Sequence, residues 1–207
     1  MFAVRKRASR VFTLDQYVQA GIMTQEQMEF LCCAIVARRN IVATGGTGSG
    51  KTTLLNALIR ELTDQSPNER LVIIEDTSEI QCAAKDYVQY HTSPERTMTQ
   101  LVRMSLRMRP DRILVGEVRG PEALDLLMAW NTGHQGGIAS LHANDSEAAL
   151  TRLSTLVSVN KEAPREIEPM IGEAVDVIVH IERTAKGGWS EKSLRCLDST
   201  ELSKRTR

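Results

Sequence analysis

Aromatic side chains are scarce in this chain, at 4% of its 207 residues. Proteins that bind single-stranded nucleic acid stack bases on aromatic rings, so the scarcity argues against such a surface. Excess charge is lacking too, because 26 basic and 26 acidic residues cancel. We therefore expect no direct nucleic-acid binding and no overall field that would draw the chain to a polyanion or a membrane.

The sequence also lacks the signals of export. No apolar stretch approaches the roughly 20 residues of a membrane span, and no apolar segment of a signal peptide follows the basic N-terminus. The cysteines, Cys32, Cys33, Cys82 and Cys196, form no CxxC pair. They are interpreted as small hydrophobic side chains of a reducing compartment. These absences predict a cytosolic protein.

Short apolar runs alternate with helical patterns, which predicts an α/β fold with a mostly parallel sheet flanked by helices. The expected strands are NIVAT from Asn40, LVIIE from Leu71, YVQYH from Tyr87, RILVG from Arg112, IASLH from Ile138 and VDVIVHI from Val175. After the last run, Gly187 and Gly188 predict a hairpin, so the sheet is expected to end antiparallel.

Helices are expected between these runs. Their ranges are 25–38, 50–62, 98–108, 121–133 and 146–159. Capping boxes are expected at Thr13 with Gln16, Thr24 with Gln27 and Thr97 with Gln100. We expect a single domain over residues 13–207. The lead of residues 1–12 is basic and strand-like, as the end of another domain or a linker would be.

The segment GGTGSGKTT, residues 45–53, follows an apolar strand and opens a helix, as a P-loop does. Its glycines allow successive N–H groups to approach phosphate oxygens, and the helix start adds a positive dipole end. Lys51 supplies a charge for the β- and γ-phosphates, and the Thr52 hydroxyl suits Mg²⁺. The nucleotide-binding residues predicted here are Gly45, Gly46, Thr47, Gly48, Ser49, Gly50, Lys51, Thr52 and Thr53.

The base of the nucleotide is inferred from a missing motif. GTPases usually carry Asn-Lys-x-Asp to read guanine, and the nearest string here, from Asn160 to Ala163, lacks the aspartate. It does not follow a strand either. ATP is therefore the expected nucleotide, together with Mg²⁺.

Acidic residues follow two of the predicted strands. Glu75 and Asp76 end LVIIE, with Glu79 beyond, and Glu117 follows RILVG. Ligands of open parallel sheets lie outside the carboxyl ends of the strands, so these acids can converge on the P-loop. We assign Glu117 to water activation and Glu75 to support of water or Mg²⁺ through its shell. The alternative for each is a helix cap or a solvated loop.

Histidines and arginines supply two further candidates. His134 and His142 are eight residues apart around a predicted strand, which is not a metal spacing. His142, at the strand end, is expected to sense the γ-phosphate by hydrogen bonding. One or two arginines could reach the nucleotide of a neighbouring subunit; the candidates are Arg103, Arg107, Arg109, Arg112 and Arg119.

Taken in order, three segments resemble the secretion-superfamily ATPases. They are GGTGSGKTTLLNAL from Gly45, IIEDTSEI from Ile73 and LRMRPDRILVGEVRGPEALDLLMAWNTGHQGGIASLHAN from Leu106. In that family the first segment corresponds to Walker A and the second to the Asp box. The third contains an atypical Walker B with Gly-Glu and then the His box. The resemblance, from Ala3 to Ile181, is greatest to the TrbB-type conjugal-transfer ATPases of type IV secretion systems.

The resemblance implies a RecA-like domain that assembles with itself into a hexameric ring. Such a ring lies on the cytoplasmic side of the bacterial inner membrane, with inner-membrane components of the machine as partners. In the family an N-terminal domain supplies arginine to the nucleotide, and Arg5 matches that place. Here only the last segment of that domain, FAVRKRAS, is expected. The four-cysteine zinc module frequent in type II systems is absent, which favours type IV.

Two alternatives stay open from the sequence. The chain could be a nucleotide-binding fragment with little turnover that acts as an interaction module for full-length subunits. It could also be the motor of a type IV pilus or tight-adherence system, with the same chemistry in a different machine.

Overall fold

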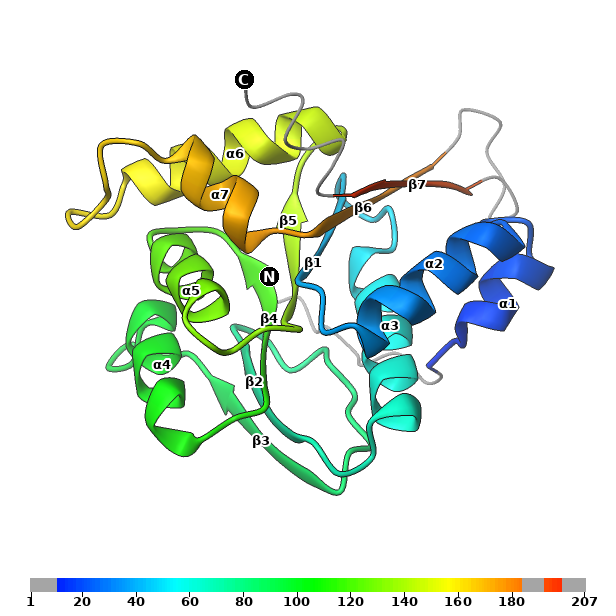
Figure 1. The fold of residues 1–207 in the computed structure, drawn as a ribbon, viewed down its shortest axis with the longest axis horizontal. Helices are drawn as coiled ribbons and strands as arrows, with labels where there is room; N and C mark the ends of the chain where they lie inside the picture. Colours follow the sequence, from blue (N-terminus) through cyan, green and yellow to red (C-terminus); the bar gives the residue numbers. More distant parts are fainter. Residues whose placement is uncertain (1–10, 184–191, 199–207) are drawn as a thin grey trace, which may run out of the picture.

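The structure is a computed structural model that describes residues 11–183 and 192–198. Its strands form one sheet in the order β3-β2-β4-β5-β1-β6-β7 (Figure 1). Strands β1 to β6 run parallel and β7 pairs antiparallel with β6. The strands are β1 (Ile41–Gly45), β2 (Arg70–Glu75), β3 (Asp86–His91), β4 (Arg112–Val118), β5 (Ile138–His142), β6 (Val177–Arg183) and β7 (Lys192–Asp198).

Helices cover both faces of the sheet (Figure 1). One face carries α1 (Leu14–Gln19), α2 (Gln25–Val36) and α3 (Lys51–Gln65). The other carries α4 (Met98–Ser105), α5 (Glu122–Asn131), α6 (Ser146–Ser158) and α7 (Glu168–Ala174). Alternate residues of each strand enter opposite cores: Ile41 and Ala43 of β1 face α3, and Val42 faces α5.

The six predicted apolar runs are all strands, and the three predicted capping boxes are all present. The expected helix over 98–108 is α4 followed by a 3₁₀ turn, Leu106–Met108, because Pro110 prevents its continuation. Gly187 and Gly188, on which the expected hairpin depends, lie outside the described residues.

Two differences from expectation have a tertiary cause. Helix α7 was not expected, since its seven residues include Pro169 and Gly172, both poor helix formers. It forms because Ile171 and Ala174 are buried in the core beneath it. The last parallel strand begins at Val177 rather than Val175, because the Asp176 carboxylate accepts the backbone N–H of Asn40 and belongs to the junction.

This topology brings the functional segments to one edge of the sheet. Strand β5 lies between β1 and β4, and its last residue, His142, is paired with Gly45 at the end of β1. Parallel strands end at the same edge, so the ends of β1, β5, β4 and β2 face one region. None of the described helices is long and apolar enough to span a membrane.

Candidate active site

The loop between β1 and α3 leads from a strand end directly into a helix. Gly50, at φ +107°, is the N-cap residue of α3 and occupies a conformation that glycine adopts at little cost. Gly45 lies against the end of β6, where a Cβ atom would overlap the carbonyl oxygen of Ile181. The first N–H groups of α3 have no partner within the helix and point toward the loop, where an anion can accept them.

Lys51, the first residue of α3, folds back over this loop. Its Nζ donates to the carbonyl oxygens of Gly45 and Gly46, both at 2.9 Å. Burial lowers the pKa of Lys51, while the neighbouring Glu117 raises it and Arg119 lowers it. The ammonium group is thus held at the loop by two neutral acceptors, which an anion in the loop can replace.

The other loop residues differ in exposure. Thr47 is exposed, whereas the Ser49 hydroxyl is buried and has no hydrogen-bond partner in the part of the chain that the structure describes. A buried polar atom without a partner is unusual in a folded protein. An anion in the loop is one group that could supply it.

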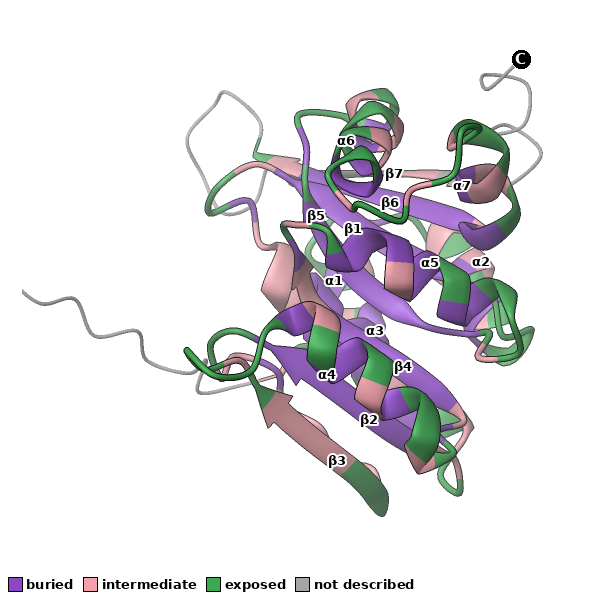
Figure 2. Cartoon of the chain, turned by 90° about the vertical axis from the view of Figure 1, so that its left-hand side faces the viewer, coloured by how far each residue is buried: buried purple, intermediate pink, exposed green. Residues whose placement is uncertain are grey.

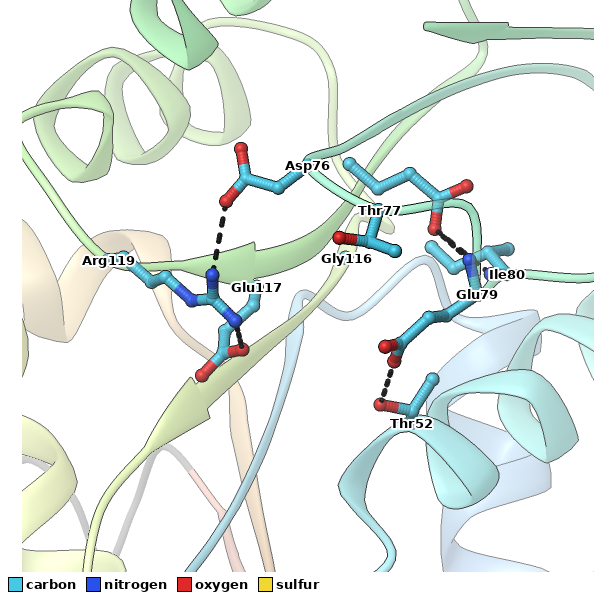
Figure 3. Close-up of a pocket in the computed structure, with 9 residues that line it drawn as sticks. Thr52, Asp76, Thr77, Glu79, Ile80, Gly116, Glu117 and Arg119 are labelled. Atoms are coloured by element: carbon cyan, nitrogen blue, oxygen red, sulfur yellow. Dashed lines mark hydrogen bonds and ion pairs between the residues drawn. The ribbon is translucent and has the colours of Figure 1, made fainter. Parts of the chain in front are cut away.

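Glu117 lies near the end of β4, at the same edge of the sheet as the loop. Its Oε2 accepts a hydrogen bond of 2.5 Å from Arg119, whose other guanidinium nitrogen lies 3.3 Å from Asp76 (Figure 3). The hydrogen bond to Glu117 is the main cause that raises the pKa of Arg119. Arg119 therefore orients Glu117 through one oxygen, and Oε1 has no hydrogen bond within residues 11–183 and 192–198.

Glu75, at the end of β2, is buried, with 2% of its surface exposed. Its Oε2 accepts the backbone N–H groups of Glu79 and Ile80, at 2.9 and 3.0 Å. Its Oε1 accepts from Gln89 and lies 3.1 Å from His91 Nε2. Protein donors thus surround both oxygens, and Glu75 also lines the pocket beside the P-loop. Its predicted support of water or Mg²⁺ stays a prediction.

The carboxylate that contacts the P-loop threonine is that of Glu79. The Thr52 hydroxyl donates to Glu79 Oε2 at 3.0 Å (Figure 3). The sequence showed Glu79 only as an acid beyond the strand end. Asn56, another contact missed from sequence, donates to the carbonyl oxygen of Glu79 at 3.1 Å. Its signal was a polar residue in the otherwise apolar run LLNAL, where it is 3% exposed.

The remaining predicted residues divide into two groups. His142 is exposed at the end of β5, next to Gly45, and its imidazole makes no hydrogen bond within the described residues. Its position is compatible with the predicted contact to a phosphate. Arg5 lies outside the described residues, so its predicted contact with nucleotide stays a prediction.

One of the five candidate arginines is wrongly placed for a role in a neighbouring site. Arg112 begins β4 at the opposite edge of the sheet and is 1% exposed, with Nη1 donating to the carbonyl oxygen of Ile35. A buried side chain cannot reach into another subunit. Arg103 is paired with Asp125 and Glu162, and Arg119 is the member of the set that lines the site.

A pocket open to solvent lies beside the P-loop. It is lined by Thr52, Glu75, Asp76, Thr77, Glu79, Ile80, Gly116, Glu117 and Arg119 (Figure 3). The described residues contain no group of three or more His, Cys, Asp or Glu side chains that could hold a metal. Mg²⁺ needs no such cage, because it binds one or two protein oxygens and completes its shell with phosphate and water. The Thr52 hydroxyl and the Glu79 carboxylate fit that requirement.

Comparison with known proteins points to one family. A family model described as "Type II/IV secretion system protein" matches residues 1–196. Conjugal transfer protein TrbB of Rhizobium radiobacter is 52% identical over 187 residues, which are 90% of this chain and 57% of that protein. Type IV secretion system protein PtlH of Bordetella pertussis is 40% identical over 172 residues, covering 77% and 50%. The matched part of the chain thus spans 57% and 50% of the length of these two relatives.

A solved structure agrees with these sequence matches. The VirB11 ATPase from the Brucella suis type IV secretion system, in complex with sulphate, is similar with a TM-score of 0.79 and 31% sequence identity. The match covers 98% of this chain and 67% of that one. The similarity therefore includes the whole sheet and both helical layers.

Proposed function

The chain belongs to the type II/IV secretion system protein family and has the RecA-like fold of secretion ATPases, and on that premise we propose that it hydrolyses MgATP to power conjugal transfer or type IV secretion. The observation that carries the proposal is the convergence of a P-loop, the Thr52–Glu79 pair and the Glu117 carboxylate at one edge of the sheet. That set supplies anion binding, metal ligands and a base.

Binding of the triphosphate begins at the start of α3. Backbone N–H groups of the loop and the helix dipole attract the phosphate oxygens, and Lys51 exchanges the carbonyl oxygens of Gly45 and Gly46 for them. Thr52 and Glu79 are the residues that would hold Mg²⁺. When bound, this ion neutralises negative charge on the β- and γ-phosphate oxygens.

Hydrolysis needs a group that takes a proton from the attacking water. Glu117 Oε1 is assigned that role, with Arg119 fixing the orientation of the carboxylate. The water oxygen bonds to the γ-phosphorus, the bond from that phosphorus to the bridging oxygen of ADP breaks, and Glu117 accepts the proton. We also propose that His142, paired with Gly45 at the start of the loop, donates a hydrogen bond to the γ-phosphate.

The assembly is part of the same proposal. Relatives named for conjugal transfer and for type IV secretion support a place in such a machine. We propose that this machine lies at the inner membrane, with this chain on its cytoplasmic side. We propose a homo-oligomeric ring, a hexamer, in which Arg5 completes the nucleotide site. The partners are then other copies of the chain and inner-membrane components of the machine.

Steady-state ATPase activity tests the chemistry. Glu117→Gln should lower turnover at least about 100-fold, the contribution of a general base, and leave ATP binding intact. Lys51→Ala should abolish ATP binding as well, because it removes the positive charge that binds the phosphates. Turnover is followed by phosphate release, and binding by equilibrium dialysis with ATP and Mg²⁺.

Glu26→Gln provides the matched control, since Glu26 is an exposed acid of α2 on a helix that does not contribute to the site. It should behave as the unchanged chain. Equal turnover in the unchanged chain, Glu117→Gln and Lys51→Ala would refute the assigned site. ATP binding without turnover in the unchanged chain would instead support the reading of the chain as a nucleotide-binding module.

A further inference from the structure

We propose that Gln89 and His91, on the edge strand β3, are positioning residues that set the Mg²⁺ ligands Thr52 and Glu79 through the buried carboxylate of Glu75. The inference rests on the proposed function, since it concerns the residues proposed there to bind Mg²⁺. Neither side chain lines the pocket, and neither was singled out by the sequence motifs.

The contacts that link β3 to Glu79 through Glu75 start from two side chains on one face of β3. Gln89 and His91 are two residues apart in the strand, so their side chains point the same way. The register places Gln89 beside Ile73 and His91 beside Glu75 of β2. Gln89 Nε2 donates to Glu75 Oε1, and His91 Nε2 lies 3.1 Å from the same oxygen. Since a carboxylate only accepts, this contact requires the proton on Nε2 of His91.

Glu75 passes this restraint to the following loop. Its second oxygen accepts the backbone N–H groups of Glu79 and Ile80, at 2.9 and 3.0 Å. Gln89 also donates to the carbonyl oxygen of Ile80 at 3.2 Å. The backbone on either side of the Glu79 carbonyl is therefore tied to β3, partly through Glu75 and partly directly.

Helix α3 holds the same loop from its other side. Asn56 donates to the carbonyl oxygen of Glu79 and accepts the backbone N–H of Gln81 at 2.8 Å. Thr52, one turn earlier in α3, donates to the Glu79 carboxylate at 3.0 Å. The loop is thus held between α3 and β3, and Glu79, the acid that accepts from Thr52, lies at the centre of these contacts.

The exposure of β3 allows the contacts of Gln89 and His91 with Glu75 to be tested by substitution. In Figure 2 this strand lies at the edge of the sheet and is half buried, whereas β2 is buried. The His91 side chain is 40% exposed, although its partner Glu75 is 3% exposed. A substitution at His91 can therefore change the positions of Thr52 and Glu79 with little disturbance of the core. Substitution of the residues that hold metal ligands in place commonly lowers metal affinity by roughly 10- to 100-fold.

The experiment compares nucleotide binding with and without the metal. Binding of N-methylanthraniloyl-ADP is measured by fluorescence in EDTA and across a MgCl₂ series, for the unchanged chain, Gln89→Leu, His91→Leu and the double variant. His91→Gln keeps a donor near the position of Nε2 and tests rescue. His134→Leu is the matched control, because this half-buried histidine contacts the Pro110 carbonyl at the opposite edge of the sheet.

We expect affinity in EDTA to stay within about twofold for all variants, because the P-loop amides are untouched. The Mg²⁺ concentration for half-maximal binding should rise roughly tenfold in His91→Leu and Gln89→Leu, and further in the double variant. His91→Gln and His134→Leu should match the unchanged chain. In ATPase assays the same shift should appear in Mg²⁺ dependence, with kcat largely recovered at saturating Mg²⁺.

Two failures are distinguishable. An unchanged chain that binds no nucleotide overturns the proposed function itself. Mg²⁺ dependence shared by the unchanged chain and both leucine variants, with a lower melting temperature in the variants, overturns the positioning role alone and makes Gln89 and His91 purely structural.

Discussion

The usual Walker B strand ends in aspartate, whereas this chain has Gly116 followed by Glu117. The packing of Glu75 against Gly116 explains the glycine. A Cβ atom at this residue would lie 2.8 Å from Cβ of Glu75 and 3.6 Å from Ile80. The side chain of Glu75 occupies that space and is held there by donors from β3 and from the following loop. The acid at this strand therefore comes one residue later, at Glu117, where the sheet edge is open.

Gly116→Ala should accordingly destabilise the protein by roughly 1–3 kcal/mol, the usual cost of overpacking, and should lower Mg²⁺-dependent turnover by displacing Glu75. Urea unfolding and ATPase rates measure the two effects. Gly172→Ala in α7 is the control, because its Cβ would meet nothing within 4 Å. It should be neutral or slightly stabilising. Equal stability of the two variants would show that Glu75 moves aside freely.

Three helices begin with the same capping arrangement, which the sequence predicted from Thr-x-x-Gln. At α2 the Thr24 hydroxyl accepts from Gln27 N at 3.2 Å, and the Gln27 side chain accepts from Thr24 N at 3.0 Å. Both hydrogen bonds are exposed and join only residues at the start of α2. The prediction succeeded because a cap depends on residues three positions apart and needs no tertiary contact.

Thr24→Ala should therefore lower the free energy of unfolding by about 1 kcal/mol, the typical value for an N-cap. Urea denaturation followed by circular dichroism provides the measurement. Thr24→Ser keeps the accepting oxygen and should retain most of the stability. If serine and alanine destabilise α2 equally, the hydroxyl contributes nothing to its start.

Strand β3 shows the limit of reasoning at the level of elements. Its apolar and polar residues predicted a strand, which is confirmed. Which strand it would join, and what its polar face would contact, depends on the order of the whole sheet. Only pairing with β2 places Gln89 and His91 on Glu75.

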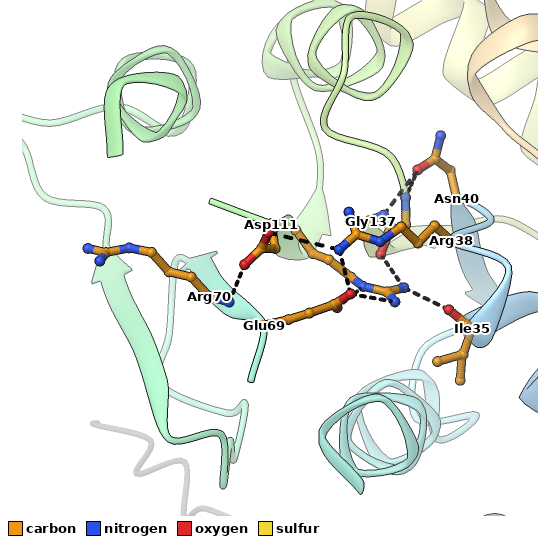
Figure 4. Close-up of polar contacts among 9 residues, drawn as sticks. Ile35, Arg38, Asn40, Glu69, Arg70, Asp111 and Gly137 are labelled. Atoms are coloured by element: carbon orange, nitrogen blue, oxygen red, sulfur yellow. Dashed lines mark hydrogen bonds and ion pairs between the residues drawn. The ribbon is translucent and has the colours of Figure 1, made fainter. Parts of the chain in front are cut away.

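At the scale of the whole molecule, a polar network ties the sheet together at the edge opposite the site. Arg112 donates to Glu69 and to the carbonyl oxygens of Ile35 and Gly136, and Glu69 also pairs with Arg38. Figure 4 shows Glu69, which precedes β2, beside Arg38 and the Ile35 carbonyl at the end of α2. One buried guanidinium thus links the starts of β2, β4 and β5 to the end of α2.

Arg112→Met should cost about 3 kcal/mol or more, because it leaves Glu69 short of a buried partner and two carbonyl oxygens without a donor. Urea unfolding measures the loss. Arg152→Met, at an exposed arginine of α6, is the matched control and should stay within about 0.5 kcal/mol. Nucleotide affinity of the folded Arg112→Met protein should be unchanged, since the network lies away from the P-loop.

Assembly is the last prediction at this scale. If turnover requires a site shared between copies, ATPase activity per chain should rise with protein concentration and level off once the ring is complete. Light scattering on the same samples reports the assembly. Constant activity per chain over a range in which the oligomeric state changes would show that one chain hydrolyses ATP alone.

Local chemistry in the sequence was enough to predict the P-loop pattern, the strands, the helix caps and the acids at strand ends, because each depends on residues close together in the chain. The same patterns did not distinguish Glu75 from Glu79, or Arg112 from Arg119. Those distinctions depend on burial and on which donors surround each charge. The tertiary structure decided them: the pairing of β2 with β3 and β4 buries Glu75, and the contact of the loop with α3 turns Glu79 toward Thr52.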